Sequence, residues 1–138
     1  KLSPGRHSAL GCSGGRLFCA LPGNPWAAQV VFTEIVAPML RRWQGFVRPE
    51  PPALSGCLAS PLKNRSGLHL TVRGLVENRE GTWTFLPDRS KGLSLFAQLQ
   101  ASAAYALIPP EVEEMRQGDI VRLRLPAMPL IAIAFAES

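Results

Sequence analysis

The chain has 138 residues, a formal net charge of +5 and a sequence pI near 9.7. This length allows one ordinary domain, or the end of one domain followed by a small second one, and we expect the second arrangement. The positive charge favours an anionic partner, which includes nucleic acid, phosphate esters and oxyanions. Because the basic residues are scattered and no aromatic-interleaved basic motif is present, we predict that nucleic acid is not the partner and keep it only as an alternative.

Other protein classes are also excluded. No charge-free apolar run reaches the ~18 residues that suggest a membrane-spanning helix, so we predict no membrane role. The first residues show no charged-then-apolar leader, and we expect a segment of a longer, non-secreted protein. The three cysteines are widely spaced, form no C-x-x-C pair, and are accompanied by only two histidines in the chain. This pattern argues against a disulfide framework and against a zinc site. We therefore predict that Cys12, Cys19 and Cys57 are free thiols and that the protein is located in a reducing compartment, the cytoplasm.

The first predicted elements are a strand and a helix. Residues 16–21, RLFCAL, are a short apolar run, which predicts a fully buried strand of a parallel sheet, with Cys19 in the core. Residues 25–44 then repeat apolar side chains every three or four positions, which predicts an amphipathic helix that ends before Gly45. The face predicted to be buried contains Trp26, Val30, Val31, Ile35, Val36, Met39, Leu40 and Trp43.

A proline interrupts this predicted helix. Pro38 has no amide hydrogen for the carbonyl of Glu34, so we expect the helix to bend or loosen near residues 34–38. Strand, tight turn and helix in this order are the closing half of a β-α unit. Residues 1–45 are therefore predicted to hold the last strand and helix of a doubly wound α/β domain.

The rest of the chain has a different character. Residues 46–66 contain four prolines and no sustained period, which predicts a linker that leads into the next domain. Residues 68–76 and 82–86 alternate polar and apolar side chains, and ENREG between them suits a hairpin. We interpret the alternating polar side chains, His69, Thr71 and Arg73, as facing solvent.

Further short elements follow. We predict a helix at residues 93–104, strands at residues 105–108 and 130–135, and a Gly118-Asp119 turn before a strand at residues 120–125. Four or five short strands with one helix in about ninety residues indicate a small β-barrel or sandwich-like domain.

The strand-to-helix turn is the best candidate site that the residues themselves suggest. Asn24 is predicted to cap the helix and Pro25 to occupy its first position. Gly23 is predicted to take a positive φ and to bring backbone close to a ligand. In an open α/β sheet this turn lies at the ligand-binding edge, and a helix N-terminus attracts anions. From these residues alone, a capped helix start without a ligand remains the alternative.

Several segments together resemble a known family. LPGNP at residues 21–25, followed by VVFTEIVAPMLRRWQG, resembles the end of the molybdopterin-binding domain in the molybdopterin molybdenumtransferase family, which includes the E domain of gephyrin. SPGRHSALG resembles the family's lysine-proline-glycine-lysine segment. GLHLTVRG and RQGDIVRLRL resemble its arginine-glycine strand and its closing glycine-aspartate hairpin. The resemblance covers nearly the whole chain in the same order.

The resemblance implies a domain division and an enzymatic activity. Residues 1–45 are expected to finish the molybdopterin-binding α/β domain, and residues 67–138 to form the small C-terminal β-barrel domain, with residues 46–66 between them. Family members insert molybdate into adenylylated molybdopterin, release AMP and form the molybdenum cofactor, with Mg²⁺ as the expected divalent metal. They are homodimers. The metal ligands are expected outside this segment, which should be inactive alone.

The resemblance also assigns roles to individual residues. Pro22, Gly23, Asn24 and Pro25 match the family's active-cleft turn, and Arg6 matches the second basic residue of the lysine-proline-glycine-lysine segment. Arg73 is expected to act in catalysis as a cation for phosphate or molybdate. A guanidinium at either position offers bidentate contacts to an oxyanion. Lys91, beside Gly92, is a further candidate for anion binding.

Departures from the family pattern leave a second function open. Ser3 replaces the usual first lysine, Leu93 stands near the usual serine, and Ser102-Ala103 replaces the usual alanine-asparagine pair. The alternative is a non-catalytic scaffold or dimerisation relative of the same family.

Overall fold

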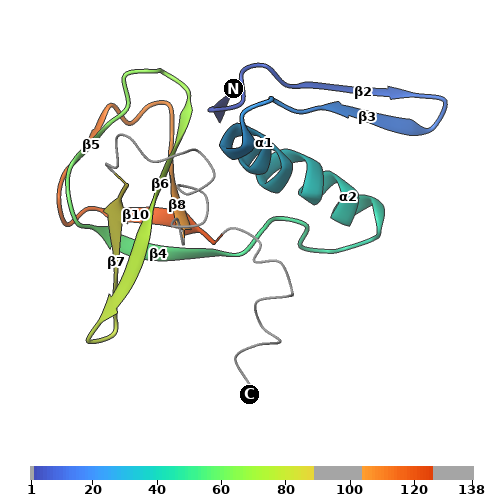
Figure 1. Ribbon diagram of the computed structural model, residues 1–138. Helices are drawn as coiled ribbons and strands as arrows, with labels where there is room; N and C mark the ends of the chain where they lie inside the picture. The colour runs from blue at the N-terminus through green and yellow to red at the C-terminus, as the bar shows by residue number, and fades with distance from the viewer. Residues whose placement is uncertain (1, 89–103, 126–138) are drawn as a thin grey trace.

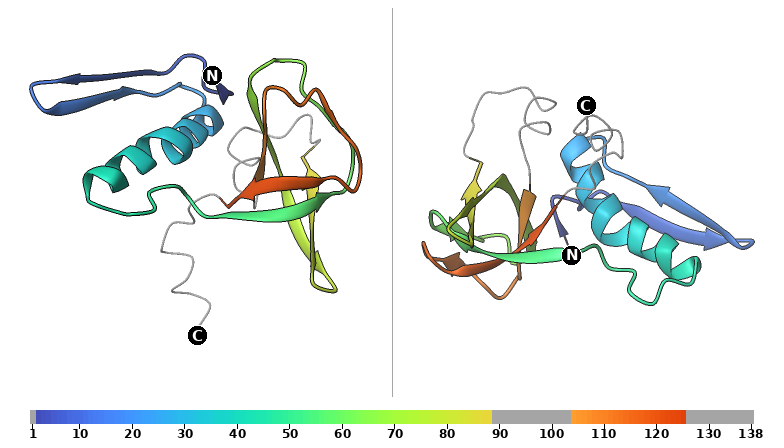
Figure 2. Two further views of the ribbon diagram at one scale, coloured as in Figure 1. Left: turned by 180° about the vertical axis from the view of Figure 1, so that it is seen from behind. Right: turned by 90° about the horizontal axis from the view of Figure 1, so that it is seen from below.

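The computed structural model describes residues 2–88 and 104–125. Figures 1 and 2 show a hairpin and a helix together on one side and a small barrel on the other. The predicted strand at residues 130–135 lies outside the described residues. So does the predicted helix at residues 93–104, except for Ala104, which begins a strand.

The N-terminal hairpin corrects one prediction. Strands β2 (Ala9–Ser13) and β3 (Arg16–Ala20) pair antiparallel, and the two glycines between them both have positive φ, as a two-residue type I′ turn requires. The predicted buried parallel strand at residues 16–21 is wrong, because β3 is mostly exposed and pairs only with β2 among the described residues. Cys19 is exposed too. The apolar run alone did not reveal its partner, whereas the glycine pair before it is the signal of a hairpin.

The predicted helix is confirmed as a continuous helix with an altered middle. It consists of α1 (Pro25–Val31), a π-helical segment η1 (Phe32–Val36) and α2 (Ala37–Trp43). The wider π turn lies directly before Pro38, which confirms the predicted loosening and follows from the missing donor of that proline. At the C-terminus, the amides of Gly45 and Phe46 return to carbonyls of the last turn at 3.0 Å, so Gly45 ends the helix as predicted.

The two halves of the helix differ in burial. Trp26, Val30, Val31 and Val36 are buried, as predicted. Met39, Leu40 and Trp43 were predicted to be buried but are exposed, and Trp43 retains 65% of its accessible surface. The prediction fails there because the β2–β3 hairpin borders this part of α2 but leaves an open apolar cavity beside Met39 and Trp43. Only the N-terminal half of the helix packs against the barrel.

The predicted β-barrel is confirmed. Strands β6, β7, β4, β10 and β8 are hydrogen-bonded in this order, and β8 pairs back with β6, which closes the ring. The barrel strands are β4 (Ala53–Leu58), β6 (His69–Arg79), β7 (Thr82–Pro87), β8 (Ala104–Ile108) and β10 (Ile120–Arg124). The short strands outside the ring are β1 (Leu2–Ser3), parallel to β6, and the pair β5 (Leu62–Lys63) and β9 (Glu114–Met115).

The two turns predicted in the barrel are also confirmed. The predicted hairpin joins β6 to β7 through Glu80 and Gly81, which both have positive φ. The predicted turn at Gly118-Asp119 precedes β10, and the carboxylate of Asp119 accepts the amide of Arg116 at 2.7 Å. The predicted linker at residues 46–66 contains β4 and β5, so part of it belongs to the sheets.

The barrel interior is filled by both small and large apolar side chains. The core residues are Leu58, Phe85, Ala104, Ala106, Val121 and Leu123. Gly74 lies where β6 changes partner from β8 to β7. A Cβ atom there would lie 2.7 Å from ring carbons of Phe85 and closer still to the carbonyl oxygen of Leu86. The glycine after Arg73 is therefore required by the packing of Phe85.

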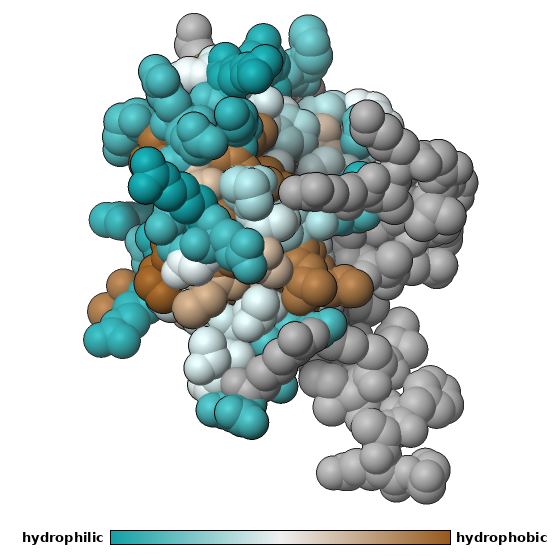
Figure 3. Space-filling view, turned by 90° about the vertical axis from the view of Figure 1, so that its left-hand side faces the viewer, coloured by the Kyte–Doolittle hydropathy of each residue, from teal (hydrophilic) through white to brown (hydrophobic). Residues whose placement is uncertain are grey.

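The barrel surface away from the helix carries both polar and hydrophobic residues. In Figure 3, polar residues cover most of the described surface on this side, and hydrophobic residues form separate patches. None of the helices within residues 2–88 and 104–125 has the length and apolar character needed to cross a bilayer.

We predict that Gly74→Ala destabilises the chain by about 1–3 kcal/mol, because the added methyl group overpacks the barrel core. Chemical denaturation measures the free energy of unfolding. Gly11→Ala on β2 is the matched control, since a Cβ there meets no atom within 4 Å. Equal unfolding free energies for the two variants would contradict the packing role of Gly74.

Candidate functional site

The structure brings two of the predicted site segments together. A cavity of about 420 Å³ lies between residues 3–7 and residues 21–24, with Ala27 of α1 completing its lining. Arg6 therefore shares a cavity with Pro22, Gly23 and Asn24, although fifteen or more residues separate them in sequence. Pro25 follows directly as the first helical residue.

The helix cap is built as predicted. Asn24 has extended backbone angles (φ −73°, ψ 121°), and its side-chain oxygen accepts the amide of Ala27 at 3.1 Å. The carbonyl of Asn24 accepts the amide of Ala28 at 2.9 Å. Pro25 has no amide hydrogen to satisfy, which makes it suitable for the first position. The cap fixes the direction in which the turn meets the cavity.

Gly23 differs from its prediction. Its φ is not among the positive values in the described chain, so the predicted left-handed conformation is wrong. Residues other than glycine can adopt the backbone conformation of Gly23, and the cap itself is formed by the side chain of Asn24. A Cβ on Gly23 would meet no described atom within 4 Å. The space in front of this glycine is open toward solvent.

A second glycine places Arg6. Gly5 has φ +135°, and a Cβ atom there would lie 2.8 Å from a methyl carbon of Val31 on α1. The backbone of this segment therefore lies directly against the helix, and the next side chain, Arg6, is exposed at the cavity. The hydroxyl of Ser8 donates to the carbonyl of Gly5 at 2.8 Å and closes the loop.

Arg73 reaches the same helix from the barrel. Its guanidinium carbon lies 5.4 Å from the centroid of the Trp26 ring, within the range of a cation–π contact. Trp26 is the residue after Pro25, so Arg73 lies against the first turn of α1, although it does not line the cavity. The interpretation of this face of β6 as solvent-exposed is wrong for two of its residues. Thr71 is buried and donates to the carbonyl of Ser3 at 3.3 Å, and Arg73 is half-buried, because the helix and β1 cover this face.

The residues that hold helix and barrel together form a row across three strands. Arg73 on β6 is opposite Tyr105 on β8, and Tyr105 is opposite Arg124 on β10. Directly opposed residues in antiparallel strands point to the same side of the sheet, and this row points toward the helix. We call Arg73, Tyr105 and Arg124 the junction row. Trp26, Val30 and Glu34, spaced by four along the helix, lie on the face that meets it.

One carboxylate connects the row to the helix. Oε1 of Glu34 accepts the phenol of Tyr105 at 2.6 Å and Nε of Arg124 at 3.1 Å. Nη2 of Arg124 is 3.5 Å from Oε2, and Nη1 donates to the carbonyl of Pro51. The Arg124 side chain is 5% exposed and that of Glu34 14%. Nearly complete burial makes this an ion pair whose partners depend on one another.

Tyr105 packs against the helix and stays protonated in this environment. Its ring meets that of Trp26 edge-on, with centroids 5.4 Å apart and planes at 80°. Burial raises the pKa of the Tyr105 phenol, and the hydrogen bond to the Glu34 carboxylate raises this pKa further. Tyr105 is thus a neutral hydrogen-bond donor that positions Glu34.

The ionisable side chains that line the cavity are Arg6 and His7, and none of the described carboxylates lines it. Residues 2–88 and 104–125 contain no group of three His, Cys, Asp or Glu side chains that could hold a metal ion. The three cysteines are free, as predicted. Lys91 lies outside the described residues, so its predicted role stays a prediction.

Our sequence predictions missed Glu34, Tyr105 and Gly5. The available signal was a carboxylate eight residues after Trp26, on the apolar stripe of the helix, where an unpaired charge is costly to bury. A buried acid at that spacing indicates a buried basic partner. The identity of the partner, 90 residues further along the chain, was not visible.

Comparisons with known proteins test the predicted resemblance. No protein-family model matches the chain. It is 28% identical over 124 residues to the molybdopterin molybdenumtransferase of Haemophilus influenzae, which covers 88% of this chain and 31% of the relative. It is also 28% identical over 106 residues to molybdopterin molybdenumtransferase 1 of Mycobacterium tuberculosis, covering 73% of this chain and 25% of the relative. The predicted resemblance to the molybdopterin molybdenumtransferase family is confirmed.

Solved structures of similarly described proteins show the same fold. A molybdopterin biosynthesis MoeA protein from Pyrococcus horikoshii superposes with a TM-score of 0.73 at 22% identity, over 93% of this chain and 31% of the other. A molybdenum cofactor biosynthesis protein from Pyrococcus furiosus gives 0.62 at 22% identity, over 90% and 42%. The chain thus spans about a third or less of the length of the curated relatives above.

We predict that the chain loses stability as the pH rises above about 10, where a tyrosine in the unfolded chain ionises while the folded Tyr105 stays protonated. Tyr105 is the only tyrosine, so the ultraviolet absorbance of tyrosinate reports this side chain alone. In the folded chain the absorbance should rise only on unfolding. Tyr105→Phe should remove the part of the stability loss that comes from this ionisation. An ordinary tyrosine titration in the folded chain would contradict the described burial.

Proposed function

We propose that this chain is the C-terminal part of a molybdopterin molybdenumtransferase. The whole enzyme inserts molybdate into adenylylated molybdopterin, releases AMP and forms the molybdenum cofactor. The confirmed kinship supports this function. The observation that carries it is the cavity between residues 3–7 and 21–24, because it joins Arg6 to the turn that matches the family's active cleft.

The contribution of these residues is electrostatic positioning of an anion. The exposed guanidinium of Arg6 donates two parallel hydrogen bonds to a phosphate or molybdate oxygen pair. The first helical turn adds the positive end of the peptide dipoles, and its cap leaves the turn rigid. Donors held in place before the substrate arrives stabilise developing charge without reorganisation, which is the main source of catalysis in such a site.

Arg73 is the proposed catalytic cation from the barrel. Its contact with Trp26 keeps the guanidinium at the start of α1 rather than free in solvent. A substrate that extends from the cavity along the first helical turn meets this second cation. Lys91 is proposed as a third cation. The barrel thus supplies charge to a substrate that is bound mainly by the turn.

The metal is expected elsewhere. The described residues do not fit a Mg²⁺ site, since they hold no suitable cluster of carboxylates, so Mg²⁺ ligands are assigned to the rest of the protein or to the second subunit. A homodimer and a cytoplasmic location belong to the same proposal.

A non-catalytic scaffold or dimerisation relative is the second candidate. Ser3, which replaces the usual lysine, supports it, because Ser3 lines the cavity and adds no positive charge there. Loss of one cation weakens binding of a multiply charged substrate.

The test is molybdate-dependent cofactor formation by the complete protein that contains this segment. We predict that Arg73→Ala lowers the rate about a hundredfold, the usual effect of removing one donor to transition-state charge. Arg16→Ala, an exposed arginine at the hairpin turn, is the matched control and should keep the wild-type rate.

Three outcomes separate the alternatives. An unchanged rate for Arg73→Ala, in a protein whose unfolding temperature is also unchanged, refutes the role of Arg73. Partial rescue by Arg73→Lys supports a charge role over a packing role. An inactive wild-type protein favours the scaffold.

A further inference from the structure

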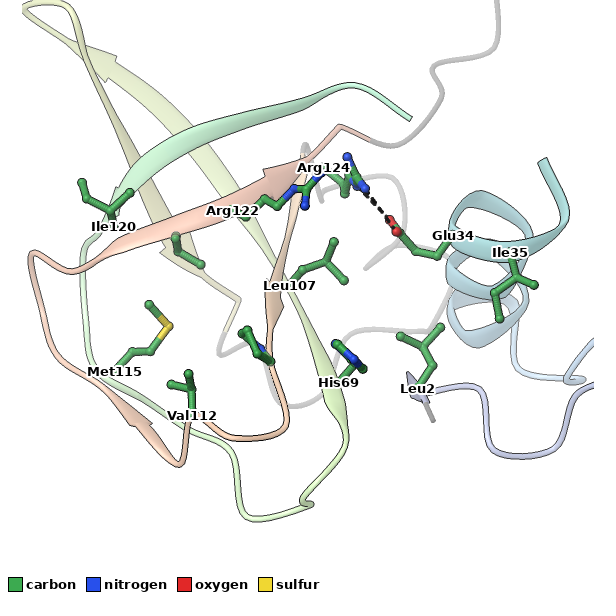
Figure 4. A pocket seen from close by; sticks show the side chains of 12 residues that line it. Leu2, Glu34, Ile35, His69, Leu107, Val112, Met115, Ile120, Arg122 and Arg124 are labelled. Carbon is green, nitrogen blue, oxygen red and sulfur yellow. Dashed lines mark hydrogen bonds and ion pairs between the residues drawn. The ribbon is translucent and has the colours of Figure 1, made fainter. Parts of the chain in front are cut away.

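A second cavity lies between the barrel and the helix and contains none of the predicted site residues. Its volume is about 680 Å³, within the ~300–1,000 Å³ typical of small-molecule sites. Figure 4 shows Leu107 of β8 in the cleft, with Arg122 of β10 above it and His69 of β6 below. Ile35 of η1 lines the opposite side. We call this cavity the barrel–helix cleft.

The cleft is lined mainly by apolar side chains. They come from β1, the helix, β8, β9 with the segment before it, and β10, so the lining depends on the docking of helix and barrel. Among these apolar residues are Leu2, Ile35, Leu107, Val112 and Met115. Leu2 and Leu107 also pack against the buried cluster of Trp26, Val30 and Tyr105, which gives this wall a fixed shape.

The charge in the cleft is positive. Arg122 lies two residues before Arg124 on β10, and its register partner is Leu107, so it stands directly beside the apolar wall. Glu34 also lines the cleft, but its carboxylate is already engaged by Arg124 and Tyr105. Among the described residues no acidic side chain pairs with Arg122, which is exposed. An anion that enters therefore meets an unneutralised guanidinium, with His69 across the cleft.

We propose that the barrel–helix cleft binds a small amphipathic anion, an apolar ring system or chain that carries one carboxylate or phosphate group. The apolar body packs on Leu107, Ile35 and Met115, and the anionic group accepts hydrogen bonds from Arg122. Burial of the body supplies most of the affinity, and the charge-assisted hydrogen bonds select for an anion. This site goes beyond the proposed function and does not depend on it.

Binding has a structural consequence. The occupant contacts Ile35 on the helix and Leu107 on the barrel at once, so it adds contacts across the junction. A ligand that binds only the folded chain raises its unfolding temperature with concentration. The cleft is therefore a place where a metabolite of this class stabilises the docking of helix and barrel.

The test uses 2-naphthoate as the probe and 2-naphthalenemethanol as its neutral counterpart with the same ring system. Backbone amide shifts of the 138-residue chain are followed by NMR during titration. We expect saturable shifts in β8 and β10, with the naphthoate bound about tenfold more tightly than the alcohol, the discrimination expected of a charge-assisted hydrogen bond. Arg122→Ala should remove this preference, and Leu107→Ala should weaken both probes.

Lys63→Ala is the matched control, because it removes one positive charge from the barrel surface outside the cleft, and it should leave both affinities unchanged. Equal affinities for the acid and the alcohol would overturn the proposal. So would shifts centred on residues 21–27, an unchanged preference in Arg122→Ala, or no saturation at millimolar probe. A well-dispersed spectrum for each variant establishes that it is folded, so a loss of binding is assigned to the cleft.

Discussion

The carboxylate of Glu34 is the point at which the helix and the barrel are joined. It accepts the phenol of Tyr105 and the guanidinium of Arg124, both from the barrel, in a place where little solvent reaches. Removal of one member of such a buried pair leaves an uncompensated charge, which costs about 3–5 kcal/mol. The π-helical turn before Pro38 lies at this position, so the irregularity of the helix and its main polar contact coincide.

The candidate site depends on this junction. The ring of Trp26 contacts both Tyr105 and the guanidinium of Arg73. Trp26 also directly follows the turn that lines the cavity together with Arg6. A shift of the barrel relative to the helix therefore changes the distance between the cation of the barrel and the cations and dipoles of the turn. Electrostatic positioning is sensitive to such shifts, because its effect depends on donors already in place. The barrel–helix cleft borders the same junction.

Local chemistry made part of this structure predictable. Asn24 and Pro25 form the cap because their preferences involve only neighbouring amides, and the Gly81 and Gly118 turns follow from backbone conformation. Contacts between distant residues were not predictable from patterns. Arg124 alternates with apolar residues as an outward-facing residue does, and its burial is explained by two distant partners, the carboxylate of Glu34 and the carbonyl of Pro51. The run at residues 16–21 was misassigned because an apolar strand does not show whether its partner is parallel or antiparallel.

The central claim is that Glu34 holds Arg73 over Trp26, and the most direct measurement is the ring-current shift of the Arg73 side-chain protons. These protons lie over an indole ring in the folded chain, so their NMR resonances should be shifted upfield. In Glu34→Gln, which removes the charge but keeps the size, we predict that this upfield shift decreases markedly while the amides of β4 and β7, which do not contact Glu34, stay unchanged. An undiminished shift in that variant would contradict the account.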